Sequence, residues 1–188
     1  MPLPPDADER VVLVDETDRE LGTAEKLAVH RDGRLHRAVS VFLFDGDGRW
    51  LLQRRADGKY HSPGQWSNTA CTHPRPGEAP ERAAARRLLE EMGIGAELRP
   101  AFRFLYRAEL TGEEPLVEHE LDHVFVGRFD GEPRPEPAEV SDWRWTEADA
   151  LRADLAVRPE AYTPWFRMLV EEGEWPEDGG SGPVASGQ

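Results

Sequence analysis

The sequence predicts an α+β fold, α/β/α-like in arrangement, in which helices flank a mixed β-sheet. Two observations predict it: one segment in the middle of the chain has the periodicity of an amphipathic helix, and short apolar stretches typical of strands precede and follow it. This order favours a sheet covered by helices. A length of 188 residues suits one ordinary domain. We expect that domain at 10–172, between a disordered start, 1–9, and a flexible acidic and glycine-rich tail, 173–188.

The strands are expected where β-branched and aromatic residues gather between polar turns. A first strand ends at the polar turn 15–18, and two more flank 45–48, whose glycines permit the positive φ of a hairpin. Two long strands surround the turn 111–114, and a short strand follows them. The predicted strands are 11–14, 39–44, 50–53, 102–108, 121–129 and 143–145.

The clearest element is a helix at 80–92. Pro80 suits a first helical turn, and apolar residues recur along one face until Gly93. Two later helices are expected at 147–154 and 160–171.

Composition narrows the possible partners. The 37 acidic and 23 basic residues give a formal net charge of −14, which repels nucleic acid and anionic lipid head groups. The chain has no run of about eighteen apolar residues, its amino-terminal residues lack the pattern of a secretory signal, and its single cysteine, Cys71, suits a reducing compartment. We therefore expect a cytoplasmic monomer that binds a small molecule and neither nucleic acid nor membrane.

The basic residues are almost all arginine. Only Lys26 and Lys59 are lysine among the 23 basic residues. An arginine-rich chain that keeps two lysines favours them where a compact ammonium is needed, as at a phosphate. Chance explains the same count equally well.

Histidines with other potential ligands occur in short segments. His30 and His36 lie six residues apart with Gly33 between them, which allows a turn that brings both imidazoles round one ion. In an extended segment Cys71 and His73 point to the same side, so a thiol and an imidazole would share one cavity.

Glu118 and Glu120 share one face of an extended segment, apart from His119, by the same period of two. Adjacent carboxylates repel each other unless a cation or a proton lies between them, although a solvated acidic strand face has the same pattern. Three neutral imidazoles with two carboxylates would make a hard N/O site suited to Mn²⁺, Mg²⁺ or Zn²⁺.

The end of the helix at 80–92 nearly matches the signature of the Nudix superfamily. Arg87 stands where Nudix hydrolases have a glutamate that helps to hold catalytic magnesium, and Thr72 stands where they have glycine. Hydrolysis is therefore less expected, whereas Glu91 keeps the means to bind magnesium diphosphate. A charged helix face explains Glu91 without any ligand.

From about Val11 to Glu171 the chain resembles the type I isopentenyl-diphosphate isomerases, which have a Nudix-like fold. Many motifs in that family's order are far more specific than any one of them. The motifs are Glu25-Lys26 with His30, Arg34-Leu35-His36, Arg54-Arg55 with Lys59, Pro63 to Asn68 leading to Cys71 and His73, Arg86 to Gly93, Tyr106-Arg107-Ala108, Glu118-His119-Glu120 and Pro164-Trp165.

The resemblance implies an isomerase of isoprenoid biosynthesis that interconverts isopentenyl and dimethylallyl diphosphate through a tertiary carbocation. It implies that Cys71 and Glu120 exchange the two protons, with Tyr106 beside Glu120, and that the aromatic face of Trp165 stabilises the cation. A buried core aromatic is the alternative interpretation of Trp165, and the two roles are compatible. The ligands implied are His30, His36, His73, Glu118 and Glu120 for Mn²⁺, Mg²⁺ or Zn²⁺, Glu91 for a Mg²⁺ that bridges the phosphates, and Lys26, Arg55 and Lys59 for the diphosphate.

Two other functions fit part of the pattern. One is a Nudix pyrophosphohydrolase of a nucleoside diphosphate derivative, against which Arg87 argues. The other is an inactive Nudix-like domain that binds metal and diphosphate, in which Cys71 and Glu120 are relics.

Overall fold

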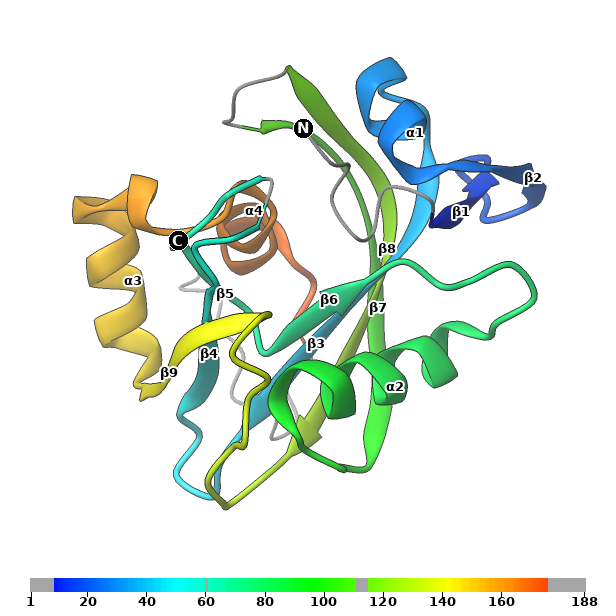
Figure 1. The fold of residues 1–188 in the computed structure, drawn as a ribbon. Coiled ribbons are helices and arrows are strands. Elements are labelled where there is room, and N and C mark those ends of the chain that lie inside the picture. The colour runs from blue at the N-terminus through cyan, green and yellow to red at the C-terminus, as the bar shows by residue number, and fades with distance from the viewer. Residues whose placement is uncertain (1–8, 60, 111–114, 176–188) are drawn as a thin grey trace.

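The computed structural model describes residues 9–59, 61–110 and 115–175 (Figure 1). Most of the two ends expected to lack order, 1–9 and 173–188, and the turn expected at 111–114 lie outside these residues. In the part of the chain described, every helix is too short or too polar to cross a membrane.

Helices separate groups of consecutive strands along the chain. The strands are β1 (Arg10–Val14), β2 (Glu20–Glu25), β3 (His36–Phe44), β4 (Trp50–Arg55), β5 (Trp66–Ser67), β6 (Ala70–Thr72), β7 (Leu98–Leu110), β8 (Leu116–Arg128) and β9 (Val140–Thr146). The helices are α1 (Lys26–Asp32), α2 (Pro80–Met92), α3 (Ala148–Val157), the 3₁₀ turn η1 (Pro159–Ala161) and α4 (Pro164–Glu172).

The described strands form one sheet centred on β3. β3 pairs antiparallel with β4 and β6 and parallel with β8, whose other edge pairs antiparallel with the long strand β7. The β1–β2 hairpin joins β3 at Leu13, and β9 continues the sheet beyond β4. Parallel and antiparallel pairs in one sheet confirm the predicted mixed sheet.

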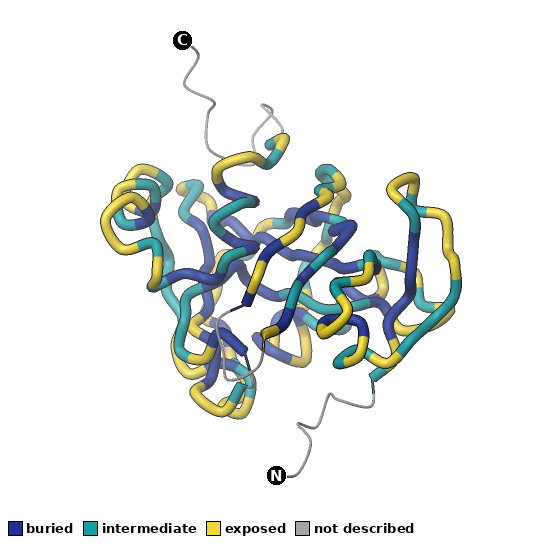
Figure 2. The backbone as a smooth tube through the Cα atoms, turned by 90° about the horizontal axis from the view of Figure 1, so that it is seen from above, coloured by how far each residue is buried: buried dark blue, intermediate teal, exposed yellow. Residues whose placement is uncertain are grey.

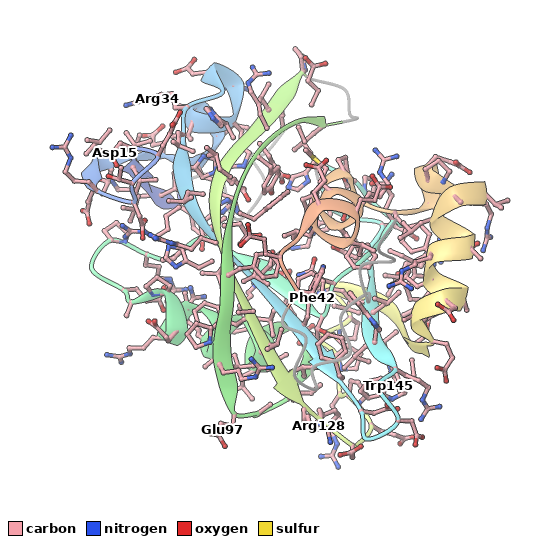
Figure 3. All side chains as sticks on the ribbon, turned by 180° about the vertical axis from the view of Figure 1, so that it is seen from behind. Asp15, Arg34, Phe42, Glu97, Arg128 and Trp145 are labelled. Carbon is pink, nitrogen blue, oxygen red and sulfur yellow. The ribbon has the colours of Figure 1, made fainter. Side chains whose placement is uncertain are left out.

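Both faces of β3 are buried, because its alternate residues enter two different cores. Phe42 packs with Phe166 of α4 on one face, whereas Val41 packs with Leu88 of α2 on the other. Phe42 accordingly lies near the middle of the molecule (Figure 3), and buried residues run through the inner strands while the connections at the rim are exposed (Figure 2). Helices on both faces confirm the predicted α+β fold class.

α2 has the bounds that the sequence predicts. Pro80 occupies its first turn, and Gly93 ends it in a left-handed conformation with φ 64°, donating its N–H to the carbonyl of Leu89. A Cβ at Gly93 would lie 2.5 Å from the carbonyl oxygen of Arg134. Only glycine therefore fits both the dihedral and the space at this helix end.

Other elements differ from the prediction. The helix expected at 160–171 begins only at Pro164, because Thr163 is extended and a separate 3₁₀ turn precedes it. β7 and β8 are longer than the predicted strands 102–108 and 121–129, because the antiparallel pairing between them continues into polar residues. The sequence pattern did not predict β2, α1, β5 or β6.

Candidate active site and metal centre

A cavity of about 660 Å³, including its open mouth, lies among β3, β6, β7, β8 and the first turns of α1 and α4, with α2 reaching it from the side. Most of the residues singled out from the sequence line it. They are Lys26, Arg55, Lys59, Cys71, His73, Glu91, Tyr106, Glu118, Glu120 and Trp165. The remaining two, His30 and His36, are buried next to the cavity wall.

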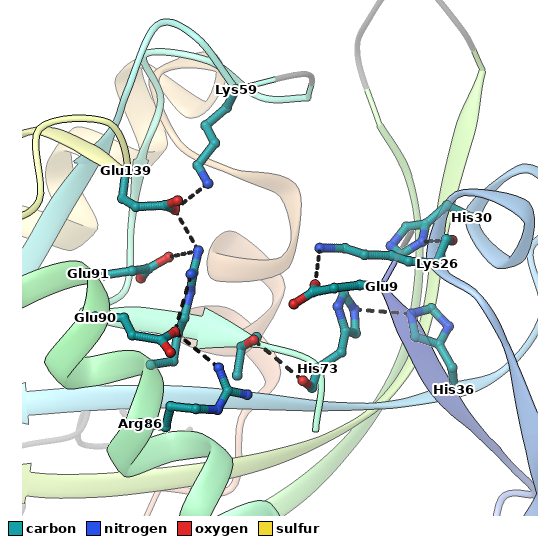
Figure 4. A network of polar contacts seen from close by, with 12 residues as sticks. Glu9, Lys26, His30, His36, Lys59, His73, Arg86, Glu90, Glu91 and Glu139 are labelled. Atoms are coloured by element: carbon teal, nitrogen blue, oxygen red, sulfur yellow. Dashed lines mark hydrogen bonds and ion pairs between the residues drawn. The ribbon is translucent and has the colours of Figure 1, made fainter. Parts of the chain in front are cut away.

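Four candidate metal ligands meet at one end of the cavity. The ligand atoms of His30, His36, His73 and Glu120 all lie within 4.8 Å of one another. His36 on β3 is the direct partner of Glu120 on the parallel strand β8, so both side chains leave the same face of the sheet. His30 lies in the last turn of α1, which Gly33 ends with φ 63° and turns back towards His36. The three imidazoles consequently lie side by side (Figure 4).

Hydrogen bonds of His30 and His36 occupy their Nδ1 atoms and leave their Nε2 atoms as the ligand atoms. His30 donates from Nδ1 to the carbonyl of Lys26 at 2.7 Å, and His36 donates from Nδ1 to the carbonyl of Arg34 at 2.8 Å, because a carbonyl only accepts. Among the described residues, the buried His30 Nε2 has no hydrogen-bond partner, and His36 Nε2 lies 3.2 Å from His73 Nε2. Lone pairs that converge in this way fit a shared divalent cation.

The ionisation states also suit a metal. Burial lowers the pKa of His30 to about 4 and that of His73 to about 3, so both rings are neutral at pH 7. Burial alone would raise the pKa of Glu120, but the neighbouring His36 and His73 outweigh burial and hold that pKa well below its usual range. Glu120 Oε1 lies 2.9 Å from His73 Nε2. Neutral imidazoles with an ionised carboxylate form a donor set for Mn²⁺, Mg²⁺ or Zn²⁺.

Glu118, the fifth expected ligand, is not part of this four-residue group in the described structure. Its Oε2 lies 3.2 Å from the hydroxyl oxygen of Tyr106, which lies 2.5 Å from Glu120 Oε2. The Tyr106 hydroxyl has one proton and can donate it to only one carboxyl group. The ionised Glu120 is nearer than Glu118, so Tyr106 donates to Glu120. Burial and the neighbouring Glu120 raise the pKa of Glu118 well above its usual range.

Cys71 reaches the same cavity from a different strand. It lies on β6 and pairs with Ser40 of β3, whereas Tyr106 and Glu120 lie opposite each other on β7 and β8. Burial raises the pKa of the Cys71 thiol to about 12, so the thiol keeps its proton at neutral pH. His73 follows at the end of β6 and lines the same cavity.

The cavity also carries positive charge, although the chain as a whole is acidic. The Arg55 guanidinium lies 5.4 Å from the centre of the Trp165 ring. Lys26 reaches the cavity from the start of α1, and Lys59 reaches it from the loop after β4, where it pairs with Glu139. Concentrated cations of this kind allow an anionic small molecule to bind an acidic protein.

Glu91 is 2% exposed and reaches the cavity from α2. It accepts a hydrogen bond from Gln53 and forms an ion pair with Arg87, each at 2.7 Å. Arg87 also lines the cavity, as do His61 and Glu9, none of which the sequence analysis placed in the site. For Arg87 a signal was present, because residues four apart share one helix face.

Two further positions bear on the expected chemistry. Trp165 is 2% exposed in the first turn of α4, and its indole N–H donates to Asn68 Oδ1 at 3.3 Å. Thr72 lies in the extended strand β6 and is not among the described residues with positive φ. The backbone at Thr72 therefore accepts a side chain where the Nudix signature has glycine.

Comparison with known proteins identifies the family. The NUDIX domain family matches residues 34–166. Isopentenyl-diphosphate Delta-isomerase 1 of Aromatoleum aromaticum is 54% identical over 164 residues, which cover 87% of this chain and 92% of that protein. Isopentenyl-diphosphate Delta-isomerase of Burkholderia multivorans is 51% identical over 169 residues, which cover 90% and 95%.

A solved structure supports the fold. The crystal structure of DR0079 from Deinococcus radiodurans matches with a TM-score of 0.74 at 24% identity, over 88% of this chain and 99% of that one. The two isomerases share about half of their residues with this chain over almost their whole length, which indicates membership of the same family and more than a shared fold. The chain belongs to the isopentenyl-diphosphate Delta-isomerase family and contains a NUDIX domain.

Proposed function

We propose that residues 10–172 form an enzyme that interconverts isopentenyl and dimethylallyl diphosphate, the activity that the names of its relatives state. The observation that carries the proposal is one cavity lined by the thiol of Cys71, by the hydrogen-bonded pair of Tyr106 and Glu120, and by several cations. Moving a double bond along a short alkene adds a proton at one carbon and removes one at another. Two acid–base groups on one pocket are what this reaction needs.

Glu120 with Tyr106 handles one proton and Cys71 handles the other. The 2.5 Å contact between Tyr106 and Glu120 lets the hydroxyl hold the carboxyl group in place and share its proton. Cys71, from a separate strand, reaches a different carbon of the same alkene. Because the reaction is reversible, each group serves as acid in one direction and as base in the other.

The protonated intermediate is a tertiary carbocation that water would capture. Trp165 is buried beside the cavity, and its aromatic face attracts a cation without offering a lone pair for bonding. The same burial excludes water from the hydrocarbon end of the substrate.

The polar end of the cavity binds the diphosphate through Lys26, Arg55 and Lys59. We assign a divalent ion, Mn²⁺, Mg²⁺ or Zn²⁺, to the four-residue group, with Glu118 beside it, and a Mg²⁺ shared with the diphosphate to Glu91. Bound metal would fix the position of the ionised Glu120 beside Tyr106. The negative net charge and the single cysteine support a cytoplasmic enzyme without nucleic-acid partners, and we expect it to act as a monomer.

The test is turnover of isopentenyl diphosphate by the full chain with Mg²⁺ and Mn²⁺, followed by proton NMR of the product. Dimethylallyl diphosphate is the expected product. A panel of nucleoside diphosphate derivatives, assayed for phosphate or pyrophosphate release, is the control for hydrolysis. Hydrolysis of any of them without isomerisation would overturn the proposal.

A further inference from the structure

Glu139 lies behind the cationic end of the cavity and contacts two of its cations. Its Oε2 accepts from Lys59 Nζ and, at 2.6 Å, from Arg87 Nη2. Lys59 and Arg87 line the cavity, whereas Glu139 is not part of its wall. Figure 4 shows the Glu139 carboxylate facing the head group of Lys59.

The main chain around Glu139 joins the two elements that carry these cations. The Glu139 carbonyl accepts from the N–H of Ala56 at 3.0 Å, in the loop that leads to Lys59. Three residues earlier, the N–H of Glu136 donates to the carbonyl of Glu91 at 2.9 Å, at the end of α2. The segment 134–139 therefore holds the loop after β4 against α2. The Glu139 side chain joins the same two elements, because it contacts Lys59 of the loop and Arg87 of α2.

Two like charges side by side repel each other, and a lysine head group on four methylenes adopts many positions in solvent. One carboxylate oxygen that contacts both cations removes the repulsion and restricts both head groups. Burial opposes the charge on Glu139, but its hydrogen bond with Lys59 and the neighbouring Arg87 outweigh burial, and they lower the pKa of Glu139. The carboxylate is therefore ionised at neutral pH.

We propose that Glu139 is a positioning residue for diphosphate recognition: it holds Lys59 and Arg87 facing the cavity without touching the substrate itself. This inference rests on the diphosphate site of the proposed function. The alternative is that Glu139 competes with phosphate for the same cations. Such a carboxylate would weaken diphosphate binding, whereas a positioning carboxylate strengthens it. Removing such a competitor would tighten binding, whereas removing a positioning residue loosens it.

The test compares full-length wild type with Glu139→Gln, using isothermal titration of inorganic pyrophosphate in the presence of Mg²⁺. We expect pyrophosphate binding roughly tenfold weaker in Glu139→Gln, the usual effect of losing a charged hydrogen bond. KM for isopentenyl diphosphate should rise by a similar factor while kcat stays unchanged, because the proton-transfer groups are untouched. Glu136→Gln is the matched control, since it removes the same charge from the same segment at an exposed position. It should bind pyrophosphate as wild type does.

Glu139→Asp keeps the charge but shortens the reach, so it should bind pyrophosphate more weakly than wild type and more tightly than Glu139→Gln. If thermal melting shows that Glu139→Gln is unfolded, Glu139→Asp carries the test alone. Wild-type affinity in the folded variants, or tighter binding by Glu139→Gln, overturns the inference. The pyrophosphate affinity is read without turnover, so loss of isomerase activity in the wild type would refute the proposed function and leave this comparison intact.

Discussion

Asp122 offers a quantitative test of the electrostatics beneath the candidate metal centre. It is 1% exposed, accepts a hydrogen bond from Ser40 at 2.6 Å, and lies two residues from Glu120 on β8. Its second oxygen is buried without a hydrogen-bond partner in the described structure. Burial, reinforced by the charge of Glu120, raises the pKa of Asp122 from 3.8 to about 8. Asp122→Asn keeps the shape and the acceptor for Ser40 but has no proton to release.

Proton linkage gives the direction in which the unfolding free energy changes with pH. A pKa raised in the folded state means that folded Asp122 keeps a proton that the unfolded chain has released between about pH 4 and 8. The stability it contributes is complete below pH 4 and is lost as the pH rises towards 8. At about 1.4 kcal/mol per pH unit, this group removes roughly 3.5 kcal/mol of unfolding free energy between pH 5 and pH 8.

The assay is urea unfolding of metal-stripped wild type and metal-stripped Asp122→Asn, followed by tryptophan fluorescence at pH 5, 6, 7 and 8. Other titrating groups occur in both proteins, so they cancel in the difference. The unfolding free energy of Asp122→Asn minus that of wild type should increase by about 3.5 kcal/mol from pH 5 to pH 8. A difference that stays constant with pH would refute the argument that Asp122 is held protonated, whatever the absolute stabilities are.

Three further predictions concern the reaction. Cys71→Ala should lower turnover by roughly 10²-fold or more while pyrophosphate binding, measured by calorimetry, stays unchanged; substantial residual turnover would exclude Cys71 as a proton-transfer group. Tyr106→Phe should lower kcat and leave KM for isopentenyl diphosphate unchanged in steady-state assays, because it removes the 2.5 Å contact with Glu120; an unchanged kcat would contradict this role. His36→Asn should lose tightly bound Mn²⁺ or Zn²⁺, measured by elemental analysis after dialysis, because one of four convergent ligands is gone; wild-type metal content would contradict the ligand assignment.

Local signals predicted the parts of the fold that depend on neighbouring residues. The helix at 80–92 was predicted completely, because Pro80, the apolar stripe and Gly93 lie within the helix or next to it. The turn at Gly33 was predicted from its position between two histidines, and its left-handed φ bears this out. α1 itself was missed, since its seven residues are too few to show a helical period.

The candidate site also has features that local sequence signals predicted and features that they did not. Alternation along one strand was enough to predict that Glu118 and Glu120 share a face, and both are buried beside Tyr106. The expectation that both carboxylates join the imidazoles depends on side-chain reach, and only Glu120 lies in the four-residue group. Arg87 and Glu139, which contact each other, lie 52 residues apart in the sequence, so their contact has no local signature. The roles of individual residues came from the resemblance, because spacing predicts proximity and not chemistry.

The most direct measurement of the central claim follows hydrogen exchange during catalysis. Isopentenyl diphosphate is incubated in D₂O with the wild-type chain and Mg²⁺, and the recovered dimethylallyl diphosphate is analysed by NMR and mass spectrometry. We expect one solvent deuterium in the methyl group formed by protonation. Product formed without solvent deuterium would contradict a pathway in which protein acid–base groups add one proton and remove another.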